Sequence, residues 1–188
     1  AGRGVAKYFS SELQSEQDDR VRLESDLRQA IAAKQFHLAF QPLVKAKTQK
    51  LIGFEALIRW NHPQRGNVPP NVFIPVAEES GLMAAIGEWV IDEACKTVAT
   101  WPEPITVALN ISPKQLVLPN LPNVVSEALA RYRIAGNRIE LEVTEGVFLG
   151  DSGTTLDVLK RLRSLGVGIA LDDFGTGYSS IGYLNKAI

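Results

Sequence analysis

The chain has 188 residues, of which 45% are hydrophobic, and its 20 basic and 21 acidic residues leave a formal net charge of −1. This composition provides apolar material for one core, and the near-zero charge argues against a polymeric nucleic acid as a partner. No apolar run approaches the roughly 20 residues of a membrane span, so we expect no membrane contact by this segment, and the single Cys95 excludes an internal disulfide and fits a cytoplasmic location.

The first 35 residues differ in composition from the rest. The stretch 10–35 is rich in charged and amide side chains, lacks glycine and proline, and carries one apolar stripe, formed by Leu23, Leu27, Ala30 and Ile31. We predict a charged amphipathic helix. Packing against the outside of the following domain is favoured over a signalling coiled coil, because the stripe is too short for several heptads.

Four later segments alternate with period two and are predicted strands, at residues 51–60, 106–111, 139–144 and 168–173. In each strand the apolar residues form one face, and an acid or amide near the end occupies the other. These polar residues are Glu55, which shares its face with Arg59, then Asn110, Glu142 and Asp172. Asp173 follows directly and begins a glycine-rich loop.

Helical periods separate the strands, at residues 87–101, 123–132 and 154–165, whereas 61–75 is interpreted as a long loop because prolines and a glycine interrupt it. Strands that alternate with helices predict an α/β fold with a parallel sheet. Polar residues at the strand ends further predict a TIM-like (β/α) barrel, whose active site lies at the carboxyl ends of the strands. His62 is interpreted as structural, and Cys95 as buried.

The strand-end residues indicate a metal site. Several carboxylate or amide groups facing inward would repel one another if no cation neutralised them. All are hard oxygen donors, which favours Mg²⁺ or Mn²⁺ over zinc. Taken alone, Glu55 has a second interpretation, a structural ion pair with Arg59.

Several motifs occur together in one order. They are Glu55-Ala56-Leu57 with Arg59-Trp60, the stretch 73–82, Asn110-Ile111-Ser112 with Gln115-Leu116, Glu142-Val143-Thr144-Glu145, and the stretch 172–180. In this order and spacing, from about residue 36 to the end, the chain resembles the EAL family of cyclic di-GMP phosphodiesterases. The resemblance implies hydrolysis of cyclic di-GMP to linear pGpG, with two divalent ions that activate water and stabilise phosphate charge.

The same resemblance implies roles for individual residues. One ion is expected on Glu55, Asn110, Glu142 and Asp172, and a second near Asp172 and Asp173. Glu145 is expected to anchor the loop 174–180, which shapes the second metal site and often the dimer contact. Gln41 and Arg59 are expected to contact the dinucleotide, although Gln41 has an alternative role as a polar strand residue bonded to backbone.

The resemblance also implies a domain organisation. Residues 1–35 are expected to be a linker helix after a GGDEF domain, and 36–188 the amino-terminal portion of an EAL domain that forms homodimers. A complete barrel typically needs about 250 residues, so we expect the final strands, with further catalytic residues, to be missing and the 188-residue fragment alone to be inactive.

Two other functions stay open at this point. One is a catalytically inactive EAL domain that acts as a cyclic di-GMP receptor. The other is a different Mg²⁺-dependent barrel enzyme acting on a carbon acid. That enzyme would need a lysine or histidine base at a strand end, and the four predicted strands carry none.

Overall fold

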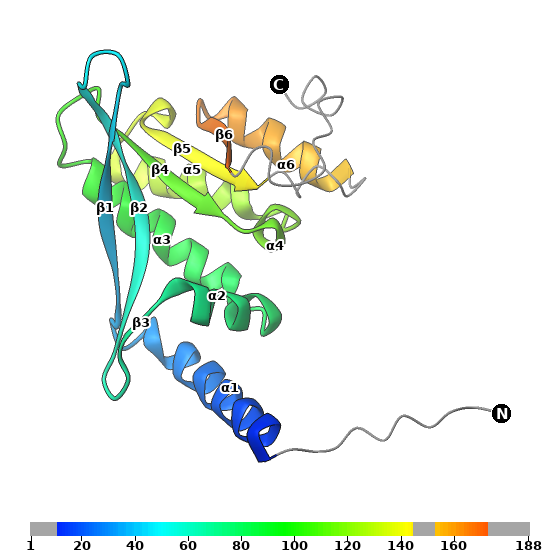
Figure 1. Cartoon of the computed structure of the whole chain (residues 1–188). Coiled ribbons are helices and arrows are strands. Elements are labelled where there is room, and N and C mark those ends of the chain that lie inside the picture. The colour runs from blue at the N-terminus through cyan, green and yellow to red at the C-terminus, as the bar shows by residue number, and fades with distance from the viewer. Residues whose placement is uncertain (1–10, 145–152, 173–188) are drawn as a thin grey trace.

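The computed structural model describes residues 11–144 and 153–172 (Figure 1). Its strands are β1 (Phe36–Val44), β2 (Leu51–His62), β3 (Gly66–Val68), β4 (Thr106–Ile111), β5 (Ile139–Thr144) and β6 (Gly168–Asp172). Its helices are α1 (Ser11–Ala30), α2 (Pro70–Glu79), α3 (Met83–Val98), α4 (Pro113–Leu116), α5 (Leu121–Tyr132) and α6 (Gly153–Ser164), with a 3₁₀ turn, η1 (Gly136–Arg138). No described helix is long and apolar enough to cross a membrane.

The described strands form one sheet in the order β1-β2-β4-β5-β6, and β3 pairs with β2. Strands β2, β4, β5 and β6 run parallel, which confirms the predicted α/β class and parallel sheet. Strand β1 is antiparallel to β2 and joined to it by the turn at residues 45–50, an arrangement that the sequence did not predict.

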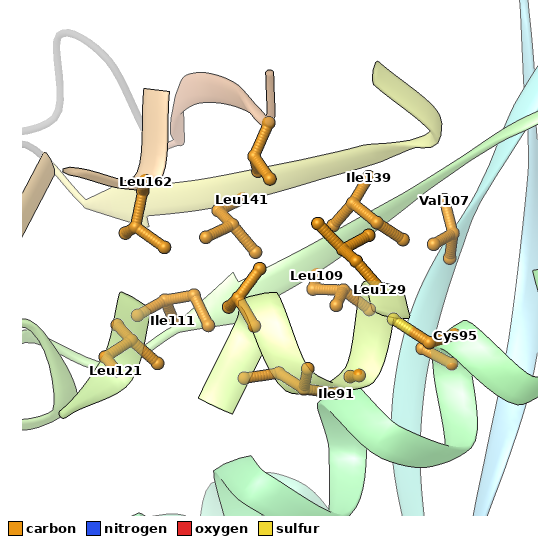
Figure 2. Close-up of a cluster of buried hydrophobic side chains, with 14 of the residues drawn as sticks. Ile91, Cys95, Val107, Leu109, Ile111, Leu121, Leu129, Ile139, Leu141 and Leu162 are labelled. Carbon is orange, nitrogen blue, oxygen red and sulfur yellow. The ribbon is translucent and has the colours of Figure 1, made fainter. Parts of the chain in front are cut away.

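Helices α3, α5 and α6 pack on one face of the sheet, because the apolar residues of each strand point that way. Figure 2 shows Leu109 and Leu141 of the strands in the same cluster as Ile91 of α3 and Leu162 of α6. These four side chains are almost fully buried, and each such burial contributes about 1.5–3 kcal/mol. The polar residues of the parallel strands are therefore directed to the opposite face.

Helix α1 packs against the domain, as predicted. Leu23, Leu27 and Ala30 are buried in a second core cluster, together with aromatic side chains of β1, β2 and α2. Two ion pairs add to this contact, Asp19 with Arg65 and Arg20 with Glu79, and the Nε2 of His62 lies 3.0 Å from a carboxylate oxygen of Asp26. The division into a linker at 1–35 and a domain from residue 36 stays a prediction.

The prediction of a long loop at residues 61–75 is wrong. Residues 66–68 form β3. Helix α2 begins at Pro70, a position that suits proline because the first turn of a helix loses no hydrogen bond to it. Phe73, Val76 and Ala77 are buried on the inner side of α2. Pro70 was interpreted as a loop signal, but it marks the start of helix α2.

The helix predicted at 87–101 exists, but its limits were misplaced. Helix α3 begins at Met83 and ends at Val98, so Trp101 lies beyond it. Cys95 is fully buried, as predicted. His62 is structural, as predicted: its Nδ1 accepts the backbone N–H groups of Gln64 and Arg65, both at 3.1 Å.

Candidate active site

Three of the predicted site residues meet on the face of the sheet opposite the helices. In the register of β4 and β5, Asn110 lies directly opposite Glu142. Glu55 of β2 pairs with Ala108, two residues before Asn110, so all three share one face. Asp172 ends β6 opposite Thr144, two residues beyond Glu142. The strand order therefore brings together residues that are far apart in the sequence.

A hydrogen bond links two of these groups. The Nδ2 of Asn110 donates to Oε1 of Glu55 at 2.8 Å. Because the amide nitrogen is used in this way, the amide oxygen is left as the acceptor for another partner. The orientation fits an Asn110 that offers oxygen to a hard cation while fixing the neighbouring carboxylate.

The electrostatics of this face are unfavourable for another negative charge. Burial, together with the charges of Glu55, Asp172 and Glu140, raises the pKa of Glu142 from its ordinary value of 4.5 to about 7. A bound cation would remove this penalty and lower the pKa again.

The described residues do not form a complete carboxylate site by themselves. Within residues 11–144 and 153–172, no three Asp, Glu, His or Cys side chains are grouped so that they hold an ion. A metal site here therefore needs the Asn110 amide or donors from elsewhere. Glu145, Asp173 and the loop 174–180 lie outside the described residues, so their predicted roles stay predictions.

Arg59 lies on the same strand face as Glu55 but is not its ion-pair partner. Its Nη1 donates to the carbonyl of Ile58 at 2.9 Å, and in the described part of the chain it forms no salt bridge with Glu55. The interpretation as a structural ion pair is thus not supported. Gln41 lies directly opposite Glu55 in the β1–β2 register, and its side chain is exposed.

A cavity of about 310 Å³ opens beside these residues. Its polar lining includes Arg59, Asn110, Glu142 and Thr144. The other wall comes mainly from α2 and α3 and is apolar, formed by Ile74, Met83, Ile86 and Val90. Potential ligands for a cation and a guanidinium for an anion therefore adjoin an apolar surface.

Comparison with known proteins identifies the family. Residues 24–187 match the family described as EAL domain. This chain belongs to the EAL domain family. A signaling protein of Caulobacter vibrioides is 47% identical over 186 residues, which cover 99% of this chain and 23% of the relative. The bifunctional diguanylate cyclase/cyclic di-GMP phosphodiesterase MucR of Pseudomonas aeruginosa is 41% identical over 189 residues, covering 98% of this chain and 28% of MucR.

A solved EAL structure supports the fold. The PaMucR phosphodiesterase in its c-di-GMP complex is 43% identical, with a TM-score of 0.83 over 88% of this chain and 68% of that chain. The predicted EAL-type, TIM-like α/β fold is thereby confirmed. The chain spans about a quarter of the length of the curated relatives it matches.

One part of this EAL domain was not found from the sequence. The cavity wall contributed by α2, including Ile74, was missed because residues 61–75 were interpreted as a loop. A usable signal was present. Phe73, Val76 and Ala77 recur at helical spacing just after Pro70, a residue well suited to the first turn of a helix.

Proposed function

We propose that this EAL domain binds cyclic di-GMP and, in the complete protein, hydrolyses one of its phosphodiester bonds to give linear pGpG. The observation that carries the proposal is the convergence of Asn110 and Glu142 with Arg59 in the lining of the cavity, where Asn110 is also bonded to Glu55. The relative MucR, named as a cyclic di-GMP phosphodiesterase, and the PaMucR complex with c-di-GMP support the choice of substrate.

We further propose that the site uses a divalent cation, Mg²⁺ or Mn²⁺, with a second ion in the active enzyme. Glu55, Asn110, Glu142 and Asp172 would hold the first ion, and Asp173 would reach the second. The donor chemistry fits, because these residues offer only hard oxygen atoms. The pKa of Glu142, which burial and the charges of Glu55, Asp172 and Glu140 raise to about 7, also supports a site that favours a cation. When bound, the ions would lower the pKa of a water molecule and stabilise charge on the phosphate.

The side chains have distinct tasks in this proposal. Arg59 binds a phosphate oxygen with charge-assisted hydrogen bonds, since its guanidinium is not used by Glu55. Asn110 orients Glu55 through the 2.8 Å bond between them. Gln41, opposite Glu55, contacts the dinucleotide. The apolar wall contributed by α2 and α3 receives the faces of a base and excludes water from the reacting phosphate.

Turnover by the full-length protein tests the proposal. With Mn²⁺ and cyclic di-GMP, chromatography should detect pGpG, and Asn110→Ala should abolish turnover and weaken Mn²⁺ binding without unfolding the protein. Glu127→Gln, which removes an exposed carboxylate of α5, is the matched control and should leave both unchanged. Tight binding of cyclic di-GMP without turnover would instead identify a receptor, and absence of both binding and turnover would overturn the proposal.

The setting of the domain is also a proposal. We expect an upstream GGDEF domain in the same parent chain, supported by the name of MucR as a diguanylate cyclase as well as a phosphodiesterase. A cytoplasmic location and a homodimer through the EAL domain stay predictions. Light scattering of the full-length protein tests the dimer.

A further inference from the structure

We propose that Gln115, seated against Gly87, is a positioning residue that holds Asn110 in place for the cation. This inference rests on the proposed metal site. It adds that contacts between α3, which contains Gly87, and α4, which contains Gln115, keep a ligand of that site in position. Neither residue is a ligand in the proposed function. Both act through the short segment that follows β4.

The segment after Asn110 is held by the buried side chain of Gln115 and by Glu78 of α2, whose carboxylate accepts the Ser112 hydroxyl at 2.5 Å. Two residues after Asn110, Ser112 is the N-cap of the four-residue helix α4. The backbone N–H of Ser112 donates to Oε1 of Gln115 at 3.0 Å, and the Ser112 hydroxyl accepts the backbone N–H of Lys114 at 3.3 Å. These contacts close a capping box. Because a single helical turn is unstable by itself, α4 depends on them for its place.

Gln115 can occupy its position only because residue 87 is a glycine. Its side chain is 3% exposed and packs against the interior of α3. A Cβ atom at position 87 would overlap the Nε2 of Gln115 and lie 2.9 Å from its Cδ. An exposed amide would swing aside, but this one is buried and bonded to Ser112. Alanine favours a helix more than glycine does, so the glycine in α3 has a packing reason rather than a conformational one.

A displacement of Gln115 affects the metal site because Ser112, which Gln115 holds, is only two residues from Asn110. If the Gln115 amide is displaced, the N–H of Ser112 loses its acceptor, and the contact of Gln115 with α3 no longer fixes the segment after β4. Asn110 lies two residues earlier and must keep its 2.8 Å bond to Glu55 while presenting its oxygen. The clamp formed by Gly87 and Gln115 therefore sets the affinity for the cation without touching it.

A double-mutant cycle in the full-length protein tests the clamp. Mn²⁺ affinity is measured by calorimetry for the wild type, Gly87→Ala, Gln115→Ala and the double variant, and the free energy of unfolding is measured without metal. Removing an outer support of a metal ligand typically weakens binding about 10–100-fold, so each single variant should lose at least about 10-fold. The double variant should match Gln115→Ala alone, because the added Cβ then has room.

Glu88→Ala is the matched control, since it changes the next residue of α3 to the same side chain at an exposed position. It should bind Mn²⁺ as the wild type does. Wild-type affinity in Gln115→Ala would overturn the clamp, as would effects of the two single variants that simply add. A loss in unfolding free energy with Mn²⁺ affinity retained would also overturn it, by assigning a purely structural role. If the wild type itself binds no Mn²⁺, the metal site fails first, which is a distinguishable result.

Discussion

The carboxyl group of Glu142 makes the stability of the metal-free protein depend on pH in a direction opposite to that of most paired acids. Burial and the charges of Glu55 and Asp172 raise its pKa from 4.5 to about 7 in the folded chain. Between these two values the folded protein binds more protons at this site than the unfolded protein does. The free energy of unfolding contributed by Glu142 therefore falls as the pH rises through this window.

The size of the effect follows from the pKa change. A pKa raised from 4.5 to about 7 corresponds at most to about 3 kcal/mol. Glu142 is only half-buried, and water screens the neighbouring charges, so we expect about 1 kcal/mol. Glu142→Gln carries no titrating proton and should lose this dependence. Mn²⁺ should reverse it in the wild type, because the ionised carboxylate is then the favoured form.

Urea unfolding of the full-length protein in a metal chelator, at about pH 5 and about pH 7.5, measures the difference. The wild type should lose about 1 kcal/mol more than Glu142→Gln over this interval. Glu127→Gln, an exposed acid on α5, should behave as the wild type. The same pH dependence in the wild type and Glu142→Gln would refute the reasoning, because the pKa of Glu142 would then not be raised in the folded protein.

Three further predictions concern single side chains. Arg59→Ala should weaken cyclic di-GMP binding by on the order of 1.5–3 kcal/mol in calorimetry, with Mn²⁺ affinity unchanged; unchanged nucleotide affinity would contradict its role. Cys95, whose pKa burial raises to about 12, should react with a thiol reagent only after denaturation, and rapid labelling of the native protein would contradict its burial. Leu27→Ala should lower the free energy of unfolding by about 2–5 kcal/mol because this α1 side chain is fully buried, whereas the exposed Val21→Ala should have little effect.

Local sequence patterns predicted the parallel strands well, for a simple reason. The period of two along β5 places Leu141 in the core and Glu142 on the opposite face, and a strand imposes this alternation whatever its neighbours are. The same pattern failed for α2. Its start at Pro70 has two meanings in a sequence, a break or a first helical turn, and only the packing of Phe73 against β1 and β2 decides between them.

The sequence by itself determined which residues offer candidate oxygen ligands and on which strand face each lies, because both depend on residue type and local period. The tertiary structure decided which of them meet. Asn110 reaches Glu55, 55 residues earlier, only because β4 pairs beside β2, and the guanidinium of Arg59 bonds to the backbone carbonyl of Ile58 and not to Glu55. Strand order and the close approach of α4 to Gly87 arise from long-range packing, which no local period encodes.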